Sequence, residues 1–67
     1  MSRIVANGEA TPTTFPCSLH EFLVRQGLLP RSVVVELNGE AVAPSEFTGR
    51  MLQPDDRLEI VRIVAGG

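Results

Sequence analysis

The sequence contains no tryptophan, tyrosine or lysine and only one cysteine. A single cysteine cannot close a disulfide within the chain, so no disulfide framework supports the core. Without lysine, the chain has no side-chain amine for Schiff-base chemistry or for accepting an acyl group. Its 67 residues carry a formal net charge of −2 with scattered arginines, which gives no basic stripe for nucleic acid. We therefore expect neither an enzyme active site nor a nucleic-acid-binding surface.

Long hydrophobic runs are also missing. No apolar stretch approaches the roughly 20 residues that span a bilayer, and residues 1–7 lack the apolar stretch of a signal peptide. We expect a cytoplasmic protein without membrane contact, which suits an unpaired thiol. Hydrophobic residues make up 43% of the chain and charged residues 21%, a balance typical of a globular domain. At this length one domain over residues 1–67 is predicted, and we expect it to be a monomer when free.

Hydrophobic periodicity predicts an α+β domain. Strands are predicted over 2–7, 10–15, 32–38 and 57–64, with short extended pieces at 41–43 and 51–52. A helix is predicted over 18–27, because Ser18 and Glu21 fit a capping box and Gly27 suits the left-handed position after a helix end. Pro12 marks the second strand as an edge strand. This order predicts a mixed sheet of four to five strands, with one main helix packed on one face and the last strand parallel to the first.

Alternation along the strands separates the core from the surface. The core is expected to comprise Ile4, Ala6, Leu19, Phe22, Leu23, Gln26, Val33, Val35, Leu37, Phe47, Leu58 and Ile60. Val34, Val61 and Ile63 fall on the opposite sheet face, where an apolar cluster can receive a partner, although small proteins also expose apolar residues routinely. Alternation directs Arg62 to the core side of the sheet, but at this point the strand extends beyond the core. Arg62 therefore either pairs with a partner carboxylate or remains a solvated charge. We assign Val34, Val61, Arg62 and Ile63 to a predicted docking face.

Cys17 and His20 have a spacing that occurs in metal sites. A structural zinc site needs four ligands, and the sequence has no second cysteine or histidine, so we expect no metal. Cys17 precedes the predicted helix, where the helix dipole can favour a thiolate. The alternative, which we favour, is a hydrophobic staple in which Cys17 packs on Phe22 across the helix start. His20 is expected to be a solvated polar residue.

The sequence finishes with Val64-Ala65-Gly66-Gly67, directly after a predicted strand. A run of small residues at a chain end is often only a frayed terminus. Glycine also suits a tail that a partner enzyme admits into a narrow cleft, because it has no Cβ. We therefore expect 65–67 to be a flexible tail, with Val64, Ala65, Gly66 and Gly67 entering partner active sites. The reacting group would be the C-terminal carboxylate of Gly67, which is ionised at neutral pH.

Several stretches of the sequence resemble the ThiS family, the sulfur carriers of thiamine biosynthesis, which have a ubiquitin-like β-grasp fold. They are residues 18–23, 34–40, 44–47 and 56–62, followed by Ala65-Gly66-Gly67. The resemblance extends over nearly the whole chain. Phe47 stands where this family commonly has tryptophan, and Pro54-Asp55-Asp56 replaces an Asp-Gly-Asp type of turn. Both departures affect packing or loop geometry and leave the tail unchanged.

The resemblance implies a mechanism centred on Gly67. A ThiF-like adenylating enzyme would use ATP and Mg²⁺ to convert the Gly67 carboxylate into an acyl-adenylate. A persulfide from a cysteine desulfurase, or from another persulfide donor, would then displace AMP and leave a thiocarboxylate. A ThiG-like thiazole synthase would accept that sulfur while it builds the thiazole moiety of thiamine. The chain itself would bind no cofactor and would be a carrier rather than an enzyme.

Three other interpretations stay open. Sulfur carriers for molybdopterin, tRNA thiolation or cysteine synthesis use the same tail chemistry, so the tail does not separate the pathways. A ubiquitin-like protein modifier would be activated in the same way but would form a conjugate with a target amine. A ubiquitin-like binding module with an inert tail would tolerate extra residues after Gly67, whereas a carrier would not.

Overall fold

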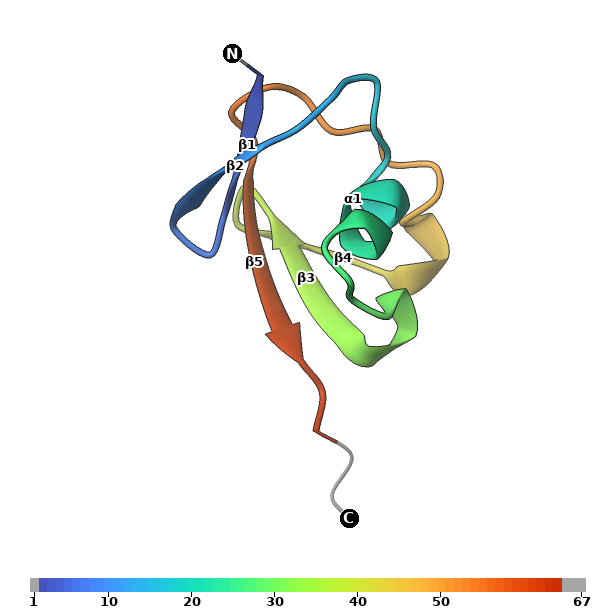
Figure 1. Ribbon diagram of the computed structural model, residues 1–67. Coiled ribbons are helices and arrows are strands. Elements are labelled where there is room, and N and C mark those ends of the chain that lie inside the picture. Colours follow the sequence, from blue (N-terminus) through green and yellow to red (C-terminus); the bar gives the residue numbers. More distant parts are fainter. Residues whose placement is uncertain (1, 65–67) are drawn as a thin grey trace.

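The computed structural model describes residues 2–64, which form a five-stranded mixed sheet with one α-helix on one face (Figure 1). In chain order the elements are β1 (Arg3–Ala6), β2 (Glu9–Pro12), α1 (Leu19–Arg25), the 3-10 turn η1 (Pro30–Ser32), β3 (Val33–Leu37), β4 (Glu40–Val42), the 3-10 turn η2 (Pro44–Glu46) and β5 (Arg57–Arg62). The strand order is β2-β1-β5-β3-β4. Strand β5 is therefore central, parallel to β1 and antiparallel to β3. The predicted α+β class and sheet are confirmed.

Both hairpins turn at an Asn-Gly pair with positive φ. The φ angles are 49° at Asn7 and 82° at Gly8, between β1 and β2, and 50° at Asn38 and 86° at Gly39, between β3 and β4. A type I′ turn needs positive φ at both central residues, which asparagine and glycine tolerate best. The first hairpin places Pro12 in β2 at the edge of the sheet. Proline has no backbone N–H, and at an edge no neighbouring strand needs one. The predicted edge position is confirmed.

Helix α1 begins at a complete capping box. The Ser18 hydroxyl accepts a hydrogen bond from the Glu21 N–H at 3.0 Å, and the Glu21 carboxylate accepts one from the Ser18 N–H at 3.1 Å. At the other end Gly27 has a φ of 76°, and the Leu28 N–H donates to the Leu23 carbonyl at 2.9 Å. Such a left-handed residue satisfies the last helix carbonyls and stops the helix. These bonds determine where α1 begins and ends, and its buried residues Leu19, Phe22 and Leu23 face the sheet.

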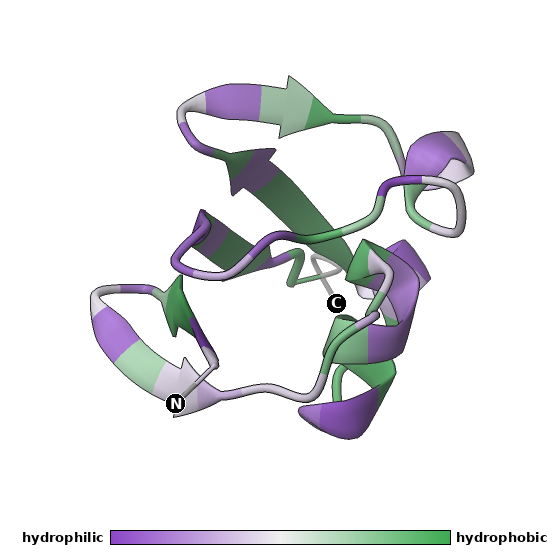
Figure 2. Cartoon of the chain, turned by 90° about the horizontal axis from the view of Figure 1, so that it is seen from above, coloured by the Kyte–Doolittle hydropathy of each residue, from purple (hydrophilic) through white to green (hydrophobic). Residues whose placement is uncertain are grey.

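The core lies between α1 and the sheet, and Figure 2 shows hydrophobic residues in both layers. Its buried members are Ile4, Cys17, Leu19, Phe22, Leu23, Val33, Val35, Leu37, Val42, Phe47, Leu52 and Leu58. Phe47, which follows η2, is 1% exposed, so its predicted place in the core is confirmed. Ala6 and Ile60 are partly buried against this cluster. Gln26 is exposed, contrary to expectation, because it is the C-cap of α1 and lies beyond the helix's apolar stripe.

The predicted strand segments are shorter in the structure. Strands β1, β2 and β3 cover 3–6, 9–12 and 33–37 rather than 2–7, 10–15 and 32–38. Residues 51–52 do not form a strand, because Met51 makes only an isolated bridge with Ser18, and the chain enters α1 directly after Ser18. Strand β5 ends at Arg62 rather than at residue 64, because its last ladder partner is Val33, the first residue of β3. Within residues 2–64, no helix combines the length and apolar character needed to cross a membrane.

Candidate functional site

An apolar patch lies on the sheet face turned away from α1, and we define it as Val34, Val61 and Ile63. Val34 of β3 and Val61 of β5 are directly opposite each other in the antiparallel ladder. The exposed fractions of the three residues are 52%, 62% and 55%. Directly opposed side chains have their Cβ atoms about 5 Å apart, so Val34 and Val61 present one continuous surface. The predicted outward position of all three residues is confirmed.

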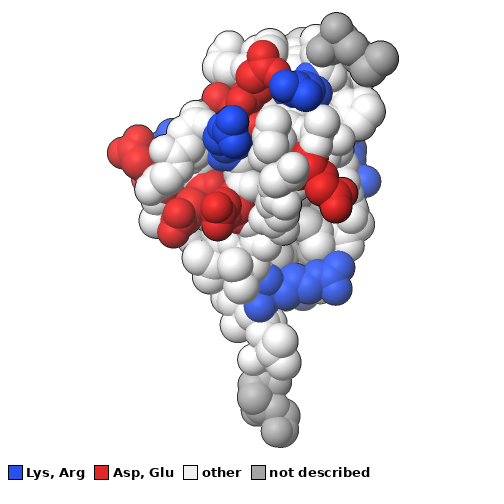
Figure 3. All heavy atoms as spheres, turned by 90° about the vertical axis from the view of Figure 1, so that its left-hand side faces the viewer, with Lys and Arg blue, Asp and Glu red and all other residues white. Residues whose placement is uncertain are grey.

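Two carboxylates border the apolar patch. Glu36 and Glu59 are opposite each other in the same ladder, two residues along β3 and β5 from Val34 and Val61. The ion pairs formed among residues 2–64 include neither of them. In Figure 3 acidic groups lie over the body of the domain, and basic groups lie beside the point where the chain departs from it. Like charges directly opposite each other destabilise a sheet, so a basic group on a partner would relieve this repulsion.

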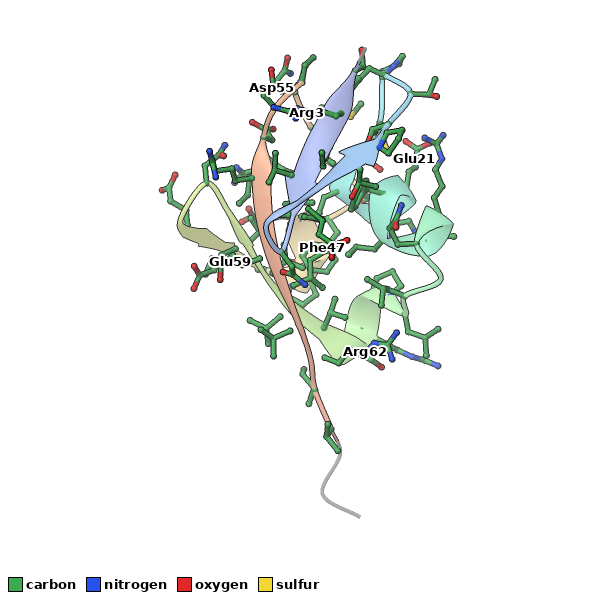
Figure 4. The ribbon with its side chains drawn as sticks, turned by 60° about the vertical axis from the view of Figure 1, so that its left-hand side comes forward. Arg3, Glu21, Phe47, Asp55, Glu59 and Arg62 are labelled. Atoms are coloured by element: carbon green, nitrogen blue, oxygen red, sulfur yellow. The ribbon has the colours of Figure 1, made fainter. Side chains whose placement is uncertain are left out.

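Arg62 lies on the other side of β5 from the apolar patch. Figure 4 shows Glu59 and Arg62 pointing to opposite sides of the strand, as alternation requires. The Arg62 side chain is exposed and lines two open hollows on the helix side, with volumes of about 210 Å³ and 350 Å³. The predicted docking face therefore consists of two surfaces on opposite sides of β5, the apolar patch and Arg62.

The chain leaves the sheet beside the apolar patch. The Ile63 N–H donates to the Ser32 carbonyl at 2.8 Å, which holds the chain against the end of β3 for one residue beyond β5. Val64 follows and is 86% exposed. Ala65, Gly66 and Gly67, which carry the predicted tail chemistry, lie outside the described residues. The structure thus locates the base of the tail and the surfaces that flank it.

Two asparagine side chains hold β5 in place, and sequence reasoning missed both. Asn7 accepts a hydrogen bond from the Ile60 N–H at 2.8 Å and donates one to the Ile60 carbonyl at 3.1 Å. Asn38 accepts from the Arg57 N–H at 2.9 Å and donates to the Asp56 carboxylate at 3.0 Å. Both belong to Asn-Gly turns, which explain their backbone geometry but give no sign of the distant side-chain partner. Together they position the strand that leads to the tail.

Cys17 and His20 do not share a site. The Cys17 sulfur is buried in the same core cluster as Phe22, donates to the Ser18 carbonyl at 3.4 Å and accepts from the Arg25 guanidinium at 3.6 Å. Burial raises the pKa of the Cys17 thiol and outweighs the opposing effect of Arg25. The sulfur is therefore a neutral packed thiol, which agrees with the favoured staple. His20 is partly exposed on the first turn of α1.

The fold and this site define a class of protein: a small β-grasp domain whose central strand carries an apolar patch and leads directly into the C-terminal residues. Comparison with known sequences makes the assignment specific. Residues 4–67 match the ThiS family, and this chain belongs to that family. The resemblance found in the sequence is therefore confirmed.

Individual relatives agree with this assignment. A thiazole synthase from Magnetococcus marinus is 32% identical over 65 residues, which cover 97% of this chain and 20% of that protein. The chain thus spans about a fifth of the length of this curated relative. A crystal structure of the thiamine biosynthesis protein (ThiS) from Geobacter metallireducens has a TM-score of 0.82 at 24% identity, covering 97% of this chain and 99% of that one. An NMR structure of a thiamine biosynthesis protein from the same organism has a TM-score of 0.80, also at 24% identity, and covers 97% of this chain and 87% of that one. At this identity the two structures show a shared fold.

Proposed function

We propose that this chain, a sulfur carrier of thiamine biosynthesis by its family, bears its sulfur as a thiocarboxylate on Gly67. The observation that carries the proposal is the family match, which runs through the glycine pair to residue 67. The exposed Val64 and the apolar patch at the base of the tail support it, because a carrier needs a surface for docking beside the group that it presents.

The Gly67 carboxylate is a poor electrophile, so the first step must give it a good leaving group. A Gly67 carboxylate oxygen would attack the α-phosphorus of ATP and pyrophosphate would leave, and the Mg²⁺ used by the adenylating partner would stabilise the charge on the phosphates. The terminal sulfur of a persulfide then attacks the acyl carbon and AMP leaves. A second thiol cleaves the resulting sulfur–sulfur bond, forms a disulfide with the sulfur of the donor and releases the thiocarboxylate. Cys17 is buried and its pKa is raised, so we assign the persulfide and the second thiol to partner proteins.

The partners follow from these steps. A ThiF-like adenylating enzyme would supply the ATP site, a cysteine desulfurase or other donor the persulfide, and a ThiG-like thiazole synthase would accept the sulfur. The relative named a thiazole synthase, of which about a fifth corresponds to this chain, supports the last partner. In this proposal the chain is a co-substrate in the cytoplasm, where thiols stay reduced, and it performs no catalysis itself.

The apolar patch and its acidic border indicate what a partner presents in return. A complementary surface would be apolar opposite Val34 and Val61 and basic opposite Glu36 and Glu59. Burying the valines would contribute to affinity, and the basic groups would offset the repulsion between the two glutamates. Charge complementarity of this kind would also orient the encounter.

The proposal is tested by reconstitution with the adenylating enzyme and thiazole synthase. We expect the chain to support ATP–pyrophosphate exchange and, with a persulfide donor, thiazole formation. A variant with one alanine added after Gly67 should lose both activities while it keeps its fold, because the reacting carboxylate is moved. Full activity of the extended variant would contradict the proposal. No exchange with the wild-type chain, although the adenylating enzyme is shown to be active, would favour a binding module with an inert tail. Exchange without thiazole, accompanied by conjugates to other proteins, would favour a protein modifier.

A further inference from the structure

One edge of β5 loses its neighbouring strand before the strand ends. Strand β1 pairs with β5 only as far as Ala6, opposite Leu58, and the Asn7 N–H then donates to the Leu58 carbonyl at 2.8 Å. At the next position the side-chain amide of Asn7 occupies the place of a strand, because it binds both the N–H and the carbonyl of Ile60. Beyond Ile60 no strand among residues 2–64 lies on this side of β5.

Backbone groups of successive β5 residues point alternately toward β3 and toward β1. This alternation shows which groups are left unpaired where β1 ends. Arg57 and Ile63 direct their backbone groups toward the β3 side, where the Arg57 carbonyl accepts from Asn38 and the Ile63 N–H donates to Ser32. Because backbone groups alternate along a strand, the N–H and carbonyl of Arg62 and the N–H of Val64 point to the opposite side. These are the groups of an open strand edge, and the chain continues from them into the predicted tail.

The surroundings of this edge leave room for another chain. An open hollow of about 350 Å³ adjoins this edge on the helix side, between the first hairpin (Asn7 and Glu9), β5 (Ile60 and Arg62) and the end of α1 (Gln26). The outer edges of the sheet are less suitable for pairing, because β2 carries Pro12 and β4 has only three residues. Among the strand edges of residues 2–64, the edge of β5 beside Arg62 has unpaired backbone groups and an adjoining hollow, and it leads directly into the predicted tail.

We propose that an extended segment of the adenylating enzyme adds to β5 as a strand alongside Arg62 and Val64, beginning where the Asn7 amide ends the pairing with β1. A row of backbone donors and acceptors is complemented by another extended backbone, which identifies the occupant as a strand. The inference rests on the proposed function. Pairing at residues 62–64 would fix the direction in which the tail leaves the domain and so position Gly67 for reaction.

A pair of substitutions at Arg62 tests this proposal by binding to the adenylating enzyme. Arg62→Pro removes the N–H that would bond to the added strand, whereas Arg62→Ala keeps the N–H and removes the side chain. Proline is tolerated here because this N–H faces away from β3 and Val61 is already extended. We expect Arg62→Pro to bind about threefold to tenfold more weakly than Arg62→Ala, the effect of one net hydrogen bond. Equal affinities of two folded variants would overturn the proposal.

Amide hydrogen exchange of the wild-type chain gives a second test that needs no variant. In the complex we expect the Arg62 and Val64 amides to become protected, while the Ile63 amide, already bonded to Ser32, changes little. Unchanged exchange at Arg62 and Val64, with contacts confined to the apolar patch, would contradict strand addition. Adenylation is measured in the same samples, so a chain that is adenylated but fails both tests removes only this inference, and a chain that is not adenylated removes the proposed function.

Discussion

The apolar patch gives the sharpest quantitative prediction, the double substitution Val34→Thr with Val61→Thr. Threonine has nearly the shape of valine and is equally suited to a strand, so the change replaces one methyl group by a hydroxyl on each residue. Both side chains have about half of their surface exposed, 52% and 62%, and would be covered by a docked partner. Burying a hydroxyl without a hydrogen-bond partner costs about 1–3 kcal/mol.

Taking about 1 kcal/mol for each site, the double variant should lose about 2 kcal/mol of binding free energy, which is roughly a 30-fold rise in Kd. Isothermal titration calorimetry against the adenylating enzyme and against the thiazole synthase measures this directly. The matched control is Val24→Thr, because Val24 lies on α1 and is 53% exposed, nearly the same as Val34. Wild-type affinity of the double variant, or an equal loss in the control, would refute the assignment of the patch as a docking surface.

Three further predictions concern the fold that carries the tail. Phe47→Ala should lower the free energy of unfolding by about 3–5 kcal/mol, because Phe47 is 1% exposed. A much smaller loss in urea unfolding would show that Phe47 does not support the core. Hydrogen bonds from Ser18 lower the pKa of Glu21, so the Glu21→Gln variant should be less stable than wild type at neutral pH. This loss of stability should vanish as pH falls through the lowered pKa of Glu21. A loss that is independent of pH in thermal melts would contradict the role of Glu21 in the capping box. Cys17 should react with iodoacetamide on the order of a hundredfold more slowly than a free thiol, because only opening of the domain exposes it; rapid alkylation of the folded chain would contradict a neutral buried sulfur.

Much of the fold follows from short-range patterns. The Asn-Gly pairs determine both hairpins, and alternation places Val35 and Leu58 inside and Val34 and Val61 outside because neighbouring strand residues point to opposite faces. The capping box of Ser18 and Glu21 marks the start of α1 because both of its hydrogen bonds are local. These features need no knowledge of the tertiary structure.

What could not be predicted depends on distant partners. The Asn7 amide reaches Ile60, 53 residues away in the chain, and neither residue type indicates that pairing. The end of β5 at Arg62 is determined by where β3 begins, so it cannot be read from residues 57–64 alone. The same holds for the open edge beside Arg62, which exists because β1 stops at Ala6.

The most direct test of the account is the intact mass of the chain after incubation with the adenylating enzyme, ATP, Mg²⁺ and a persulfide donor. We expect a species heavier by one oxygen-to-sulfur exchange, and fragmentation should place the exchange at Gly67. If the adenylating enzyme is shown to be active and no adenylate or sulfur appears on Gly67, the proposed carrier chemistry is contradicted.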